Sequence, residues 1–195
     1  MKILFINTCV RENSRTKRLA DYFLKEFSGD EITEVQPRKE GIAGLDEEML
    51  KVRDQALLEK NYDHPVLAYA KQFKEADMIV ITAPYWDLSF PSALKNYIER
   101  ICAVGMTFDY DEHGIPYGMC SAENLVYIQT AGGMVDNDAF GYGYIKALCE
   151  NFFHIEKTFC FKAEGLDLPF NDPEELLKKA EEEIDSFLPD LKQNA

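Results

Sequence analysis

Hydroxyl groups and basic side chains gather in one short segment near the start of the chain. The segment from Asn7 to Thr16 carries Thr8, Ser14 and Thr16, and the window Arg11–Arg18 holds four basic residues and one acid. It lies between an apolar run and a helical pattern, so its backbone N–H groups are expected at a helix N-terminus. Such a terminus attracts a phosphate through its dipole and its unpaired donors. We interpret the segment as a phosphate-binding loop; a capped, solvated helix start is the alternative.

A second segment is crowded with aromatic and apolar side chains. It runs from Pro84 through Tyr85, Trp86 and Asp87 to Leu88, and Trp86 is the only tryptophan of the chain. Large rings at the end of a strand are costly if they simply meet water. The segment is therefore either a platform for a flat ligand or a piece of ordinary core.

A third segment reads Thr130, Ala131, Gly132, Gly133 and follows another apolar run. Paired glycines permit a positive φ and a close approach of the backbone to a ligand, although a lone pair of glycines also fits an ordinary turn. Taken together, the three segments indicate one ligand with a phosphate at one end and a flat ring at the other.

The elements that must position these loops alternate between strand and helix. We expect strands at Lys2–Asn7, Glu31–Gln36, Met78–Thr82, Asn124–Thr130 and His154–Ala163. Helices are expected from a cap at Asn13 or Ser14 to Phe27, in two pieces between Leu45 and Phe73 with a break at His64-Pro65, and at Pro91–Ala103, Gly143–Phe153 and Pro173–Leu188. The stretch Gly105–Ser121 is expected to be irregular.

Five strands with intervening helices predict an α/β fold, a doubly wound five-stranded parallel sheet within a single domain over residues 1–195. The common strand order for such a sheet is 2-1-3-4-5. That order brings the carboxyl ends of the first, third and fourth strands together, which is where the three loops begin.

Charge and cysteine content limit the partners. A net charge of −14 argues against nucleic acid and anionic membrane. Five cysteines without a CxxC pair suggest neither a disulfide framework nor a zinc ribbon, so we expect a reduced, cytoplasmic protein. No apolar run approaches the roughly 18–20 residues that span a bilayer, and the spacing of the three histidines predicts no metal site.

The chain resembles the FMN-dependent NAD(P)H:quinone oxidoreductases and azoreductases of the flavodoxin-like fold over nearly its whole length. The resemblance rests on Thr8-x5-Ser14-Arg15-Thr16, on Pro84-Tyr-Trp-Asp-Leu88 followed by Pro91-Ser-Ala-Leu-Lys-Asn-Tyr, on Gly105-Met-Thr-Phe-x-Tyr110, on Thr130-Ala-Gly-Gly133 and on Ala163-Glu-Gly-Leu166. It implies FMN as the cofactor, NADH or NADPH as the co-substrate, and a small quinone, azo or nitro aromatic as the acceptor. Hydride would pass through flavin N5 in a ping-pong cycle.

The resemblance also assigns residues. It implies that Thr8, Ser14, Arg15 and Thr16 hold the FMN phosphate, that Pro84, Tyr85, Trp86, Asp87 and Leu88 run along the ribityl chain and the ring, and that Thr130, Ala131, Gly132 and Gly133 flank the ring. It implies a homodimer in which Phe108, Tyr110 and Tyr117 line the partner's pocket, with a buried dimer contact as the alternative. No catalytic side chain is expected, because the cofactor carries the reaction. The azoreductase branch usually has asparagine in place of Asp87; this carboxylate either points away from the flavin or lowers its potential.

Two other functions are compatible with parts of the sequence. A flavodoxin-like electron carrier or FMN-binding module would hold FMN without oxidising NAD(P)H directly. A phosphatase of the low-molecular-weight type is suggested by Cys9-x5-Arg15-Thr16, in which Cys9 would be the nucleophile and Arg15 the phosphate clamp. Asp172-Pro173 resembles the general-acid loop of that family.

Overall fold

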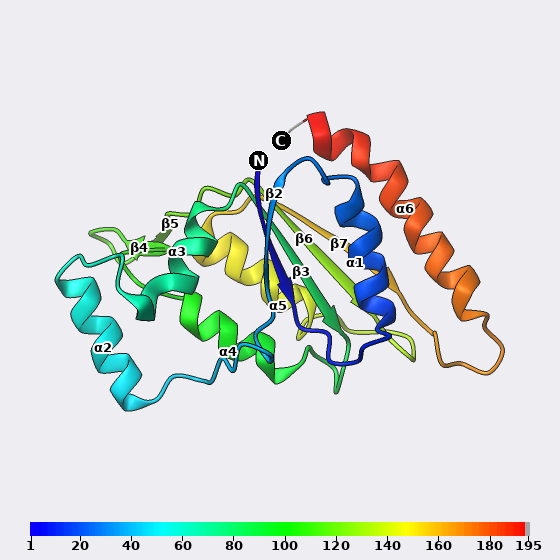
Figure 1. Cartoon of the computed structure of the whole chain (residues 1–195), viewed down its shortest axis with the longest axis horizontal. Coiled ribbons are helices and arrows are strands. Elements are labelled where there is room, and N and C mark those ends of the chain that lie inside the picture. The colour runs from blue at the N-terminus through cyan, green and yellow to red at the C-terminus, as the bar shows by residue number, and fades with distance from the viewer. Residues whose placement is uncertain (194–195) are drawn as a thin grey trace.

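The computed structural model describes residues 1–193 and is built around one parallel sheet (Figure 1). Its strands are β1 (Lys2–Asn7), β2 (Glu31–Val35), β3 (Met78–Pro84), β6 (Asn124–Thr130) and β7 (Lys157–Ala163), in the order β2-β1-β3-β6-β7. Counting only these strands, this is the predicted order 2-1-3-4-5, so the flavodoxin-like doubly wound sheet is confirmed. Residues 194 and 195 of the predicted single domain lie outside the described residues.

Helices cover both faces of the sheet. They are α1 (Arg15–Lys25), α2 (Glu47–Leu58), α3 (Ala68–Glu75), α4 (Ser92–Ile101), α5 (Tyr142–Leu148) and α6 (Pro173–Gln193), with short turns η1 (Pro65–Leu67) and η2 (Cys149–Phe153). Figure 1 shows α1 and α6 side by side on one face, and α3, α4 and α5 belong to the core of the other face.

The central strands are rich in apolar residues because both of their faces are buried. In β1, Ile3 and Phe5 enter the core under α1 and α6, whereas Leu4 and Ile6 enter the core under α3, α4 and α5. The same alternation holds in β3 and β6. Glu31–Val35 is at the edge, as its mixed polar and apolar pattern predicted.

Four of the elements predicted from the sequence differ from those in the structure. The stretch Gly105–Ser121, expected to be irregular, contains an antiparallel hairpin of β4 (Phe108–Tyr110) and β5 (Pro116–Gly118). The fifth sheet strand begins at Lys157 instead of His154, because His154 adopts a left-handed conformation with φ 58° after η2. The helix expected at Gly143–Phe153 divides into α5 and η2. The last helix runs to Gln193, past the expected end at Leu188.

Candidate ligand-binding site at the carboxyl edge of the sheet

A pocket of about 270 Å³ lies where the loops after β1, β3 and β6 meet. We call it the three-loop pocket. It is lined by Val10, Arg11, Asn13, Ser14, Arg15, Thr16, Pro84, Tyr85, Trp86, Thr130, Ala131, Gly132 and Asp167. Nine of the thirteen cofactor residues expected from the sequence are among them, so the strand order does assemble the three segments. The pocket combines a helix N-terminus, two arginines and two aromatic rings.

The first loop ends in the cap of α1. The Ser14 hydroxyl accepts a hydrogen bond from the Lys17 N–H at 3.3 Å, and the first turn of α1 carries no acidic residue. Thr16 is buried, and its Oγ1 hydrogen-bonds Oγ1 of Thr130 across 2.7 Å. The positive end of the α1 dipole is therefore free of a competing carboxylate on that helix, and a hydroxyl pair joins the first loop to the third.

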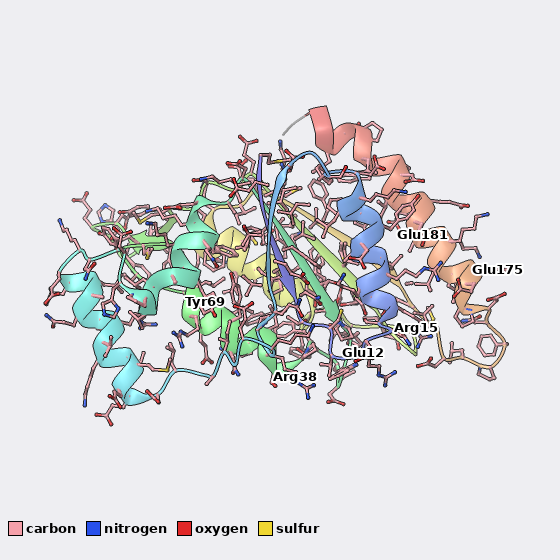
Figure 2. The ribbon with its side chains drawn as sticks, viewed as in Figure 1. Glu12, Arg15, Arg38, Tyr69, Glu175 and Glu181 are labelled. Atoms are coloured by element: carbon pink, nitrogen blue, oxygen red, sulfur yellow. The ribbon has the colours of Figure 1, made fainter. Side chains whose placement is uncertain are left out.

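Arg15 reaches from α1 to the loop between β7 and α6. Its Nη2 lies 2.6 Å from Oδ1 of Asp167, and its Nη1 donates to the Leu166 carbonyl at 3.1 Å. Figure 2 shows Arg15 at the start of α1, at the edge of the molecule where the strands end. Asp167 is a site residue that the sequence reasoning missed. The only signal for it was its place directly after the motif Ala163-Glu-Gly-Leu166.

The second loop is a two-residue hairpin turn. Trp86 and Ser89 exchange both backbone hydrogen bonds at 2.8 Å, while Asp87 and Leu88 have φ values of 51° and 66°. Two consecutive left-handed residues define a type I′ turn. The turn carries Asp87 and Leu88 out of the three-loop pocket, and Leu88 is 65% exposed. Asp87 instead lines an adjoining hollow of about 710 Å³, which shares Val10 and Trp86 with the pocket.

Two side chains of the second loop form hydrogen bonds to the backbone of the third loop. The Tyr85 hydroxyl donates to the Asn137 carbonyl at 2.9 Å, and the Ser89 hydroxyl donates to the Phe140 carbonyl at 2.5 Å. Together with the Thr16–Thr130 pair, these contacts connect all three loops.

The glycine pair of the third loop serves a different purpose from the one expected. Neither Gly132 nor Gly133 has a positive φ. Gly165, in the loop after β7, has a φ of 71°. Gly132 instead packs closely against Asp167: an added Cβ would lie 2.3 Å from Oδ2 of Asp167, so the carboxylate would have to move. Gly133 does not line the pocket; its carbonyl accepts a hydrogen bond from the Gly165 N–H at 2.9 Å.

Four other expected site residues lie elsewhere. Thr8 is buried and does not line the pocket; its hydroxyl donates to the Thr82 carbonyl at 2.8 Å. Phe108 is buried and stacks on Phe152 with ring centroids 4.5 Å apart. Tyr110 and Tyr117 are each 45% exposed, and none of the three hairpin aromatics lines either hollow. Their expected role in a partner's pocket stays a prediction.

The geometry around Cys9 does not suit a phosphatase. Its Sγ lies 4.0 Å from Oγ1 of Thr82, and burial raises the pKa of the thiol, whereas a nucleophilic cysteine requires a lowered pKa. The Arg15 guanidinium is engaged by Asp167. Asp172, the expected general acid, caps α6 by accepting the Glu174 N–H at 2.9 Å.

Within residues 1–193, no three histidine, cysteine or acidic side chains come together as ligands for a metal ion. No helix in that part of the chain combines the length and the apolar character needed to cross a membrane.

Comparison with known proteins places this geometry in context. The family model described as "Flavodoxin-like fold" matches residues 1–188. The chain is 37% identical to FMN-dependent NADH:quinone oxidoreductase 2 of Clostridium acetobutylicum, with 95% of this chain and 99% of the relative covered. It is 34% identical to the FMN-dependent NADH:quinone oxidoreductase of Coprothermobacter proteolyticus, with 95% and 97% covered.

Solved structures share the fold. An azoreductase from Bacillus anthracis superposes with a TM-score of 0.81 at 24% identity, covering 94% of this chain and 96% of that one. An FMN-dependent NADH-azoreductase from Bacillus anthracis, solved in complex with FMN, superposes with a TM-score of 0.80 at 24% identity, covering 97% and 98%.

Proposed function

The chain belongs to the family of FMN-dependent NADH:quinone oxidoreductases with a flavodoxin-like fold, and from this premise we propose that it is an FMN-dependent NAD(P)H oxidoreductase. Its acceptors are quinones, azo compounds, nitro compounds or related small aromatics. The observation that carries the proposal is the three-loop pocket, in which one helix N-terminus and one pair of aromatic rings face the same space.

The residues present fit FMN. At the phosphate end, Ser14 and Thr16 supply hydroxyls, and the first turn of α1 supplies unpaired N–H groups. Arg11 supplies positive charge, as does Arg15, whose charge is partly offset by its ion pair with Asp167. At the ring end, Tyr85 and Trp86 offer aromatic surface, and Trp86 is 39% exposed.

When bound, FMN supplies hydride transfer between the nicotinamide nucleotide and the acceptor. The chain's own residues therefore need to bind and orient instead of exchanging protons. Ser14 and the α1 terminus would hold the phosphate end of the cofactor. The second and third loops, joined by the hydrogen bonds of Tyr85 and Ser89, would hold the ring end.

The adjoining hollow offers space for the two substrates. It shares the lining residues Val10 and Trp86 with the pocket, and its lining also includes Phe90 and Pro91. A ping-pong enzyme needs only one such space, because the oxidised nucleotide leaves before the acceptor enters.

The decisive test is anaerobic addition of NADH, and separately of NADPH, to the FMN-loaded protein. We expect the flavin's visible absorbance to bleach with at least one nucleotide and to return when menadione is added. Protein that cannot be loaded with FMN would contradict the proposal. Protein that holds FMN but is bleached by neither nucleotide would instead favour the electron carrier.

We also propose a homodimer and a cytoplasmic location. The β4–β5 region exposes a group of apolar side chains, Val104, Tyr110, Ile115 and Tyr117, that a second subunit could cover. The five cysteines are unpaired, which suits a reducing compartment. Sedimentation of the wild type and of Ile115→Asp tests the dimer: the variant should sediment as a monomer, and a monomeric wild type would refute it.

A further inference from the structure

One carboxylate, that of Asp167, lies in the pocket that we assign to the FMN phosphate. It is the only acidic side chain among the described residues that line this pocket. A carboxylate beside a phosphate dianion is unfavourable, and neither the cofactor nor its chemistry explains its presence.

The position of Asp167 is fixed by backbone contacts to the third loop. Its N–H donates to the Gly132 carbonyl at 2.9 Å, and the preceding Leu166 N–H donates to the Ala131 carbonyl at 3.1 Å. The absence of a side chain on Gly132 leaves the space that the carboxylate occupies. These contacts fix the backbone of Asp167 at the pocket wall, so its carboxylate stays beside the pocket although it is largely exposed.

The carboxylate is paired with the arginine that should attract the phosphate. Oδ1 of Asp167 lies 2.6 Å from Nη2 of Arg15, and both side chains are partly exposed, at 66% and 33%. Within this pair the positive charge of Arg15 is offset before any ligand arrives. An anion entering the pocket meets a neutral pair and the α1 terminus, with Arg11 as the other basic side chain in the wall.

We propose that Asp167 sets the affinity of the pocket for phosphorylated flavin: it offsets Arg15 and repels the phosphate, and so weakens FMN binding. This inference rests on the proposed function, since it requires FMN in the three-loop pocket. The preference of the protein for FMN over riboflavin is then smaller, and its cofactor exchanges more readily, than the phosphate-binding features of the first loop alone would allow.

The test is Asp167→Asn, which removes the charge and keeps an oxygen that can accept from Arg15. Dissociation constants for FMN and riboflavin are measured by quenching of flavin fluorescence. We expect the variant to bind FMN about fivefold more tightly, which corresponds to about 1 kcal/mol. Riboflavin, which lacks the phosphate, should bind the variant and the wild type equally. The gain for FMN should shrink as salt is added, because both charges are solvent-exposed.

Two further variants separate charge from structure. Asp63→Asn makes the same charge change at a carboxylate that pairs with Lys71, outside the pocket, and should leave FMN affinity unchanged. Asp167→Glu keeps the charge and should keep the wild-type preference between FMN and riboflavin, even if Asp167→Asn folds poorly. Unchanged or weaker FMN binding by Asp167→Asn, or an equal gain for riboflavin, would overturn the inference. A wild-type protein that binds no FMN would instead refute the proposed function.

Discussion

The hydroxyl pair between Thr16 and Thr130 allows a double-mutant cycle at the wall of the pocket. The two Oγ1 atoms are 2.7 Å apart, and the residues are only 1% and 8% exposed. Replacing either threonine by valine keeps the shape but leaves the other hydroxyl buried without this partner. Each single change should lower the free energy of unfolding by about 1–2 kcal/mol, which is the cost of an unsatisfied buried polar group.

The double variant should lose less than the sum of the two single losses. With both hydroxyls gone, no buried donor or acceptor is left over, so we expect a coupling energy of about 1 kcal/mol. The assay is urea unfolding of the apoprotein, because bound FMN would add stability by mass action. Thr33→Val on the exposed edge strand is the control and should change stability by less than about 0.5 kcal/mol. Strictly additive losses would refute the idea that this contact joins the first and third loops.

Three further predictions test other parts of the structure by equilibrium unfolding. Leu88→Gly should raise the free energy of unfolding by about 0.5–1 kcal/mol, because glycine accepts the φ of 66° that strains leucine; a loss would argue against the type I′ turn. Gly118→Ala should cost about 2–3 kcal/mol, because its Cβ would lie 2.2 Å from the Phe153 carbonyl oxygen, and Gly29→Ala, with open space, serves as control; equal stability of the two would be inconsistent with the packing of β5 on η2. Burial raises the pKa of the Cys160 thiol to about 12, whereas the same thiol in the unfolded chain has a pKa of about 8.5. The unfolded chain therefore loses that proton first, and stability should fall as pH rises from about 8.5 toward 12, with a shallower slope in Cys160→Ala; an unchanged slope would refute this assignment.

The fold could be predicted from the sequence because each central strand contains a continuous apolar run. Lys2–Asn7 and Asn124–Thr130 have the bounds that their sequences predicted, since each has an uninterrupted apolar stretch, at residues 3–6 and 125–128, with polar residues at both ends. The β4–β5 hairpin was not predicted. Its strands have three residues each, too few to show an alternation, and its stability depends on contacts with η2 that are distant in sequence.

The sequence predicted those parts of the site that follow from which strands are neighbours in the sheet. Ser14, Trp86 and Thr130 meet in one pocket because the strand order requires their loops to be neighbours. Asp167 could not be found in this way, because the loop after the fifth sheet strand was not expected to fold back onto Gly132. The left-handed pair Asp87–Leu88 also escaped notice, since leucine rarely adopts that conformation and the turn is selected by the hydrogen bonds around it.

The contacts among the loops imply that the pocket exists before the cofactor binds. The first and third loops share the Thr16–Thr130 pair, and the second and third share the hydrogen bonds of Tyr85 and Ser89 to backbone carbonyls. Each contact joins residues that are more than 50 positions apart, so these contacts form when the sheet folds. The conformational entropy of the loops is therefore lost on folding and not on FMN binding. Binding affinity is then governed by the charges and donors that face the ligand. For this reason a single carboxylate such as that of Asp167 can shift FMN affinity without any change in the fold.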